Sequence, residues 1–143
     1  MRFLILLALI GPAAPAGIER SIPLSATLDP DQVVGGTFSF AMGTGTFVLD
    51  PIANTLAFDV RYNGAITGGF ETEAHFHGPA PAGQNAPILF NLPLGTTKVG
   101  VWNYPQSVER ALLRGLVYVD IHSLELVQGE CRGQILPDVK PPS

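Results

Sequence analysis

From residue 22 onward, hydrophobic and polar residues alternate with a period of two. The clearest case is segment 55–62, whose apolar residues occupy every second position: Leu56, Phe58, Val60 and Tyr62. Because successive side chains of an extended strand point to opposite faces, this pattern predicts a strand that is buried on one side. Shorter patterns of the same kind lie at 22–28, 38–42, 47–49, 71–77, 87–92, 98–102, 116–122 and 131–136.

Turn-forming residues separate these segments, and the chain contains 16 Gly and 13 Pro residues. About eight short strands at this spacing predict an all-β fold, an antiparallel β-sandwich, with a small barrel as the alternative. Only residues 107–114 have a helical pattern. Ser107 is the expected N-cap of this short helix, and Gly115 is its expected stop.

The first residues have the pattern of a secretion signal. Arg2 precedes an apolar run at 3–10, and an Ala14-Pro15-Ala16 triplet follows. This order is typical of a signal peptide, and it predicts cleavage after Ala16. The alternative is a first core strand or helix. The expected organisation is a signal peptide at 1–16, a domain at 17–137 and a flexible tail at 138–143, in a secreted or periplasmic protein.

The charge balance and the single cysteine exclude several classes of function. The formal net charge is −4, and the eight Lys and Arg residues are scattered singly, so no basic stripe is available for nucleic acid. Beyond the first ten residues, no apolar run approaches the roughly 20 residues needed to cross a bilayer. Cys131 cannot form an intramolecular disulfide, and it is expected in the core, with a thiol ligand or an intersubunit disulfide as the alternatives. Few charges protect the edge strands, so a homodimer is a further expectation.

All three histidines lie in two of the predicted strands. His75 and His77 are two residues apart, and His122 closes the segment 116–122. Residues two apart on a strand point the same way, so the first two imidazoles can converge on one ion while Ala74 and Phe76 face the core. If the two strands are neighbours, His122 completes a cluster of three imidazoles.

Charged residues near these histidines could complete the site. Glu73 and Asp120 are candidates for a fourth ligand or for a hydrogen-bond acceptor behind a ligand. Glu130 and Arg132 share the face opposite to Cys131, and they could pair with each other or with Glu73 or Asp120; a ladder of cross-strand charge pairs is the simpler interpretation. Imidazole and carboxylate ligands favour Cu(II), with Zn(II) as the second choice. The alternative is that the histidines form hydrogen bonds and hold no ion.

Four strings in the second half of the chain carry a family resemblance: residues 74–83 (AHFHGPAPAG), 85–92 (NAPILFNL), 115–123 (GLVYVDIHS) and 129–135 (GECRGQI). Together they resemble the CHRD (chordin-type) domain. The resemblance implies an all-β fold and secretion, because known members include multidomain chordins that bind growth factors and secreted single-domain bacterial proteins. The chain departs from the usual pattern at Asp120, Ser123 and Cys131, and Asp120 adds a carboxylate beside His122.

The sequence therefore predicts an extracytoplasmic metal-binding protein that uses His75, His77 and His122. Two alternatives stay open: a metal-free module for protein interaction or adhesion, and a copper-dependent redox enzyme. No GxSxG or HExxH motif indicates a hydrolase, so a binding protein is favoured over an enzyme. Trp102 and Tyr104 either form an exposed aromatic contact or cap the core.

Overall fold

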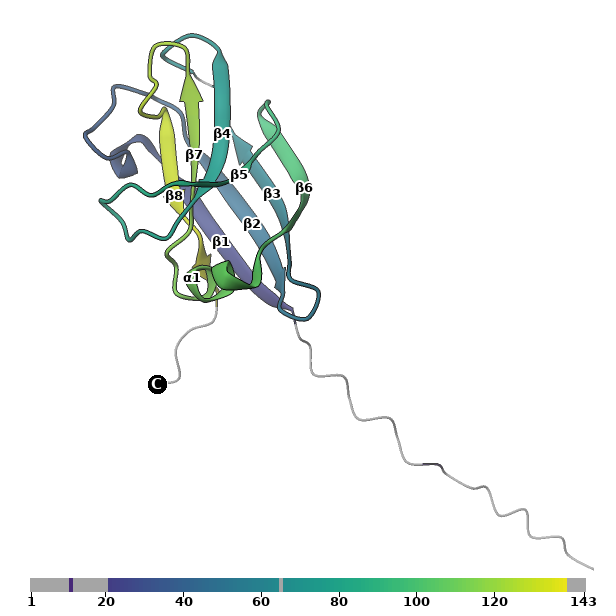
Figure 1. Cartoon of the computed structure of the whole chain (residues 1–143). Helices are drawn as coiled ribbons and strands as arrows, with labels where there is room; N and C mark the ends of the chain where they lie inside the picture. The colour runs from purple at the N-terminus through teal and green to yellow at the C-terminus, as the bar shows by residue number, and fades with distance from the viewer. Residues whose placement is uncertain (1–10, 12–20, 65, 139–143) are drawn as a thin grey trace, which may run out of the picture.

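The structure is a computed structural model that describes residue 11 and residues 21–64 and 66–138. Within this part the chain forms two antiparallel sheets that pack face to face as a β-sandwich (Figure 1). The first sheet has the order β6 (Thr97–Asn103), β3 (Thr55–Tyr62), β2 (Gly43–Asp50), β1 (Ile22–Leu28) and β9 (Leu136–Pro137). The second has the order β5 (Ile88–Asn91), β4 (Glu71–His77), β7 (Tyr118–Ser123) and β8 (Cys131–Gln134). The predicted all-β sandwich is confirmed.

Alternate residues of the strands fill the space between the sheets, as the period of two predicts. Phe76 of β4 lies at the centre, and its ring centroid is 5.4 to 6.0 Å from those of four other aromatic residues: Phe47, Phe58, Phe90 and Trp102. Each large apolar side chain buried in this way contributes about 1.5–3 kcal/mol. Trp102 and Tyr104 are both buried, so they belong to the core and do not form an exposed contact. Cys131 is also buried, as expected.

The segment 38–42 differs from its prediction. Its residues form no strand, and the alternation runs in the opposite sense, with Ser39 and Ala41 buried and with Phe38, Phe40 and Met42 exposed. The reason is a buried carboxylate: Ser39 Oγ donates a hydrogen bond to Glu130, which turns the flanking phenylalanines outward.

The helical segment is shorter than predicted. A 3-10 turn, η2 (Gln106–Val108), leads into α1 (Glu109–Leu113), and the N-cap residue is Val108, so the prediction of Ser107 as N-cap is wrong. Gly115 ends the segment as expected, with a φ of 70° that favours glycine. No described helix is long and apolar enough to cross a membrane.

The last predicted strand, 131–136, is divided between the two sheets. β8 pairs with β7, whereas β9 pairs with β1, and the chain crosses at Ile135, whose N–H donates to Val117 O. The sheets also meet where Asp29, which precedes the 3-10 turn η1 (Pro30–Gln32), forms two backbone hydrogen bonds with Arg132, each of 3.1 Å. This bridge covers part of the β8 edge.

The ends of the chain lie largely outside the described residues. These include the predicted signal peptide, residues 1–16, except for residue 11, and residues 139–143 of the predicted tail. Asp138, the first residue of that tail, donates its backbone N–H to Pro23 O at 3.0 Å and accepts a hydrogen bond from Ser25 Oγ.

Candidate metal centre

Strands β4 and β7 are neighbours, and their register brings the histidine-bearing segments together. His75 lies opposite Asp120, and Glu73 lies opposite His122. Because Ala74 and Phe76 fill the core, the alternate residues of β4 project from the outer face of the second sheet. The side chains of β7 that leave the core project from the same face.

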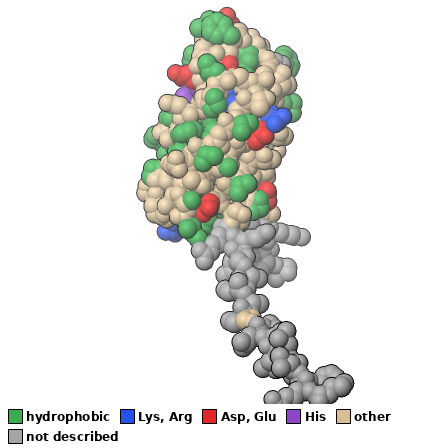
Figure 2. Space-filling view, turned by 90° about the vertical axis from the view of Figure 1, so that its right-hand side faces the viewer, with side chains coloured by type: hydrophobic (Ala, Val, Ile, Leu, Met, Phe, Trp, Pro, Cys, Tyr) green, Lys and Arg blue, Asp and Glu red, His purple; other side chains and the backbone are tan. Residues whose placement is uncertain are grey.

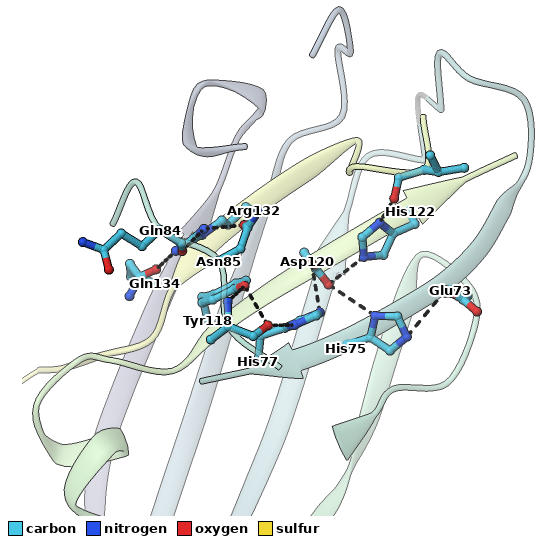
Figure 3. A network of polar contacts seen from close by, with 12 residues as sticks. Glu73, His75, His77, Gln84, Asn85, Tyr118, Asp120, His122, Arg132 and Gln134 are labelled. Atoms are coloured by element: carbon cyan, nitrogen blue, oxygen red, sulfur yellow. Dashed lines mark hydrogen bonds and ion pairs between the residues drawn. The ribbon is translucent and has the colours of Figure 1, made fainter. Parts of the chain in front are cut away.

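Four side chains converge on one point of this face (Figure 3). They are His75, His77, Asp120 and His122, and one potential ligand atom from each lies within 4.8 Å of the others. Asp120 occupies the centre. Its Oδ1 is 3.0 Å from His122 Nε2 and 3.5 Å from His75 Nδ1, and its Oδ2 is 3.1 Å from His77 Nε2.

Backbone carbonyls fix the orientation of two of the rings. His77 Nδ1 lies 2.7 Å from Ala86 O, and His122 Nδ1 lies 2.8 Å from Val127 O. A carbonyl oxygen can only accept a hydrogen bond, so each Nδ1 carries a proton. In the neutral imidazole the remaining lone pair is then on Nε2, which is the atom directed at Asp120.

When His77 and His122 are neutral, the lone pairs of their Nε2 atoms face the Asp120 carboxylate, whose oxygens are also acceptors. Three of the converging atoms, His75 Nδ1, His77 Nε2 and Asp120 Oδ1, are buried and have no hydrogen-bond partner among the described residues. A buried polar atom without a partner costs about 1–3 kcal/mol. Protons on the imidazoles or a metal ion would each give these atoms a partner.

In the metal-free cluster, the pKa values of the three histidines and of Asp120 are shifted from their ordinary values. Burial lowers the pKa of His77 and His122, but the Asp120 carboxylate outweighs it and raises both values above the ordinary one. For His75, burial dominates, and its pKa is lowered. Burial raises the pKa of Asp120, but the close contacts and positive charges of His122 and His77 together lower it to about 2. Asp120 is thus ionised at neutral pH.

Glu73 lies at the edge of the cluster. Its Oε2 is 3.8 Å from His75 Nε2, on the ring nitrogen that points away from Asp120, and its side chain is 66% exposed. The structure therefore places Glu73 behind His75 and does not place it among the four converging atoms.

Arg132 supports the cluster from the side. Its guanidinium carbon lies 3.5 Å from the centre of the Tyr118 ring, and that ring stacks on His77 with centroids 5.0 Å apart. Nη1 of Arg132 donates to Gln84 O at 2.7 Å, two residues before the carbonyl of Ala86 that orients His77. Arg132 is thus a neighbour of the cluster and has none of the converging atoms.

Glu130 lies elsewhere, in a hydrogen-bond network of its own. Its carboxylate accepts hydrogen bonds from Ser39 Oγ, from Ser123 Oγ at 2.6 Å, and from the backbone N–H groups of Gly68 at 2.7 Å and Thr67 at 3.2 Å. The expected pairing of Glu130 with Arg132, Glu73 or Asp120 is not the arrangement found, because these four donors already satisfy the carboxylate.

Three groups that orient the cluster were not identified from the sequence. The carbonyls of Ala86 and Val127 come from loops, and no side-chain pattern identifies a backbone oxygen as an acceptor. Tyr118 is the third group, and it stacks on His77 because the register pairs the two residues across the strands.

A family comparison accounts for the four strings on which the resemblance rests. The model of the CHRD domain matches residues 24–135. The chain belongs to the CHRD domain family. The matched range of this CHRD domain begins in β1 and ends just after β8, and it contains all four converging residues. No curated protein and no solved structure matches the chain.

Proposed function

We propose that this CHRD domain binds one transition-metal ion, Cu(II) or Zn(II), through His75, His77, His122 and Asp120. One observation carries the proposal: three imidazole nitrogens and a carboxylate oxygen converge within 4.8 Å, and three of these buried atoms have no hydrogen-bond partner among the described residues. A metal ion satisfies all of them at once, since each supplies a lone pair.

The hydrogen bonds behind the histidines support a metal site. Ligating histidines almost always donate their second ring N–H to a carbonyl or carboxylate, which fixes the tautomer. His77 and His122 already have this partner in Ala86 O and Val127 O. The competing arrangement, with protonated histidines around Asp120, supplies the same positive charge. Metal binding near neutral pH should therefore release protons.

The ligand set favours Cu(II) over Zn(II). Three imidazoles and one carboxylate suit both ions, but a given nitrogen and oxygen site binds Cu(II) more tightly in the Irving–Williams order. Cys131 is buried, and burial raises the pKa of its thiol to about 12, so it supplies no thiolate ligand at neutral pH. Copper held in this way could cycle between two oxidation states, and a redox enzyme is the extension of the proposal.

The test is calorimetry and metal analysis on protein purified without a histidine tag. We expect one Cu(II) or Zn(II) per chain, and nitrogen couplings in the electron paramagnetic resonance spectrum of the copper form. His75→Ala should lower the affinity at least 100-fold. The matched control is Glu130→Gln, which changes a buried carboxylate outside the cluster and should keep the wild-type affinity and stoichiometry. Absence of binding by the wild type would refute the metal site. Ascorbate reduction of the copper form, followed by reoxidation in air, tests the redox extension.

A metal-free interaction module is the second candidate. The observation that favours it is a group of exposed phenylalanines at one end of the sandwich, which the metal site does not explain. If the cluster binds no metal, this surface becomes the functional part of the domain.

We also infer that the protein is exported, with cleavage after Ala16. The N-terminal pattern and the membership in a family with secreted members support this inference. Mass spectrometry of protein recovered outside the cytoplasm should find Gly17 at the N-terminus, and an intact Met1 on exported protein would contradict the inference.

A further inference from the structure

The loops at one end of the sandwich expose large apolar side chains. This group, termed the apolar tip, consists of Phe38 (92% exposed), Phe40 (75%), Phe70 (67%), Leu124 (56%) and Val127 (72%). The tip lies where β2 and β4 begin and β7 ends, at the upper end of the molecule in Figure 1, and Figure 2 shows hydrophobic side chains at this end.

Hydrogen bonds join the three loops of the apolar tip. Phe40 N–H donates to Thr67 Oγ1 at 3.2 Å, which connects the loop before β2 to the loop before β4. Leu124 N–H donates to Phe70 O at 3.2 Å, which connects the loop before β4 to the loop after β7. The three loops that carry the five residues are therefore held together at this end of the sandwich.

The buried Glu130 holds the tip in this conformation. It accepts hydrogen bonds from Ser39, between the two most exposed phenylalanines, and from the backbone N–H groups of Thr67 and Gly68. Gly68 is required here, because a Cβ would lie 2.4 Å from Ser123 Oγ. The aromatic side chains are thus exposed by a fixed internal network.

We propose that the apolar tip inserts into the interface of a lipid bilayer with uncharged headgroups. The shape of the tip favours insertion. Phe38 is almost fully exposed, so its ring projects from the surface and does not line a groove. A projecting aromatic group can enter the fluid boundary between headgroups and acyl chains without a preformed pocket.

The tip carries little charge. The segments 36–42, 63–70 and 124–128 contain a single charged side chain, Glu125. The other end of the sandwich differs, since Asp50, Glu109, Arg110 and Arg114 lie in or beside its loops. Without basic residues the tip has no means to attract anionic headgroups, so the expected association is hydrophobic and insensitive to salt.

The backbone around Phe40 is also suited to a bilayer. Polar backbone groups can enter hydrocarbon only when they are already paired. Phe40 N–H has its partner in Thr67, Phe40 O accepts from Asn63 Nδ2, and Met42 N–H donates to Asn63 Oδ1. A strand-pairing protein partner would need such groups to be free, whereas a bilayer requires them to be satisfied.

A tryptophan placed in the tip gives a local test. Trp102 is the only native tryptophan, and it is already buried, so its emission provides a constant background. Phe40→Trp should shift to shorter emission wavelengths with phosphatidylcholine vesicles, and brominated phosphatidylcholine should quench it. Ile52→Trp, exposed at the opposite end of the sandwich, is the matched control and should do neither. An unchanged Phe40→Trp spectrum would overturn the proposal.

A second variant measures how much the tip contributes to binding. Phe38→Ser/Phe40→Ser should lower partitioning into phosphatidylcholine vesicles at least tenfold in sedimentation, whereas Ile52→Ser should partition like the wild type. Circular dichroism and the urea midpoint report whether each variant is folded. Equal partitioning of the wild type and the double variant would contradict insertion by the tip. Self-association of the wild type without vesicle binding, abolished in the double variant, would instead indicate that a second copy of the chain covers the surface.

Discussion

Two buried carboxylates, Asp120 in β7 and Glu130 just before β8, have opposite surroundings. Glu130 accepts hydrogen bonds from two hydroxyl groups and two backbone N–H groups, so every neighbour donates. Asp120 faces ring nitrogens, two of which carry a lone pair toward it in the neutral tautomer. A fully satisfied buried carboxylate stabilises the fold, whereas one among acceptors indicates a binding site.

The pKa values of Glu130 and Asp120 are both lowered, but the groups that lower them differ in the same way. Burial raises the pKa of Glu130, but the hydrogen bonds from Ser123, Ser39 and the backbone together lower it below the ordinary value. Burial also raises the pKa of Asp120, but here the close contacts and positive charges of protonated His122 and His77 lower it. Glu130 is therefore stabilised by fixed groups of the fold, whereas Asp120 depends on a positive charge that can be exchanged.

The largest expected effect comes from replacing each carboxylate by its amide. Glu130→Gln must direct an amide N–H at either Gly68 N–H or Thr67 N–H, and it should lower the free energy of unfolding by about 3 kcal/mol. Asp120→Asn directs an N–H at imidazole lone pairs and should cost less than about 1 kcal/mol in metal-free protein at pH 8. Urea unfolding of both variants measures the difference, and equal losses would remove the distinction between the two carboxylates.

Added metal should bring the two variants to nearly the same stability. At a free metal concentration of about 100 times the wild-type Kd, binding stabilises the wild type by about 2.7 kcal/mol. Glu130→Gln should gain the same increment, because its cluster is intact. If Asp120→Asn binds about 100-fold more weakly, its gain falls to about 0.4 kcal/mol. Thermal unfolding with and without Zn(II) measures these increments, and a full gain in Asp120→Asn would exclude Asp120 as a ligand.

The alternation of residues predicted most of the strands, but it could not distinguish the two carboxylates. A period of two is a local property, so segments such as 55–62 were predicted correctly. The segment 38–42 has the same period, but a partner 91 residues away, Glu130, decides which of its faces is buried. The break between β8 and β9 at Ile135 likewise depends on pairing with distant strands.

The candidate site, like the strands, could be predicted from the sequence only in part. Alternation placed His75 and His77 on one face and allowed His122 to join them if the strands were neighbours, which the register of β4 and β7 establishes. The orienting carbonyls of Ala86 and Val127 could not be predicted, because they depend on loop conformation. Asp120 and Glu130 each lie next to a core residue in the sequence, and only the folded chain shows which one receives donors.

A change of pH should affect the two regions in different windows. The raised pKa values of His77 and His122 mean that their pairs with Asp120 stabilise metal-free protein below the unfolded value of roughly 6.5 and are lost as the pH rises through the folded values. The lowered pKa of Glu130 acts in acid, where its contribution is lost as the pH falls through the folded value.

Unfolding free energies between pH 3 and pH 9 test this separation. In Asp120→Asn, the fall in unfolding free energy near neutral pH (the neutral step) should disappear. In Glu130→Gln, the fall in acid should become smaller. The neutral step should also disappear when metal is bound, because the ion replaces the protons. A neutral step that survives in Asp120→Asn would mean that the charge of Asp120 does not control these two histidines.

The smallest effect is expected at Glu73, where the cluster meets solvent. Its carboxylate approaches the outer nitrogen of His75 at 3.8 Å, and its side chain is 66% exposed, so water screens the interaction. Glu73→Gln should therefore lower the metal affinity by less than about threefold, which corresponds to an exposed ion pair of at most about 0.6 kcal/mol. Calorimetry with Cu(II) can resolve this difference from the much larger loss expected for Asp120→Asn. A loss at Glu73 as large as that at Asp120 would mean that Glu73 moves inward to coordinate the ion, and that the centre includes a second carboxylate.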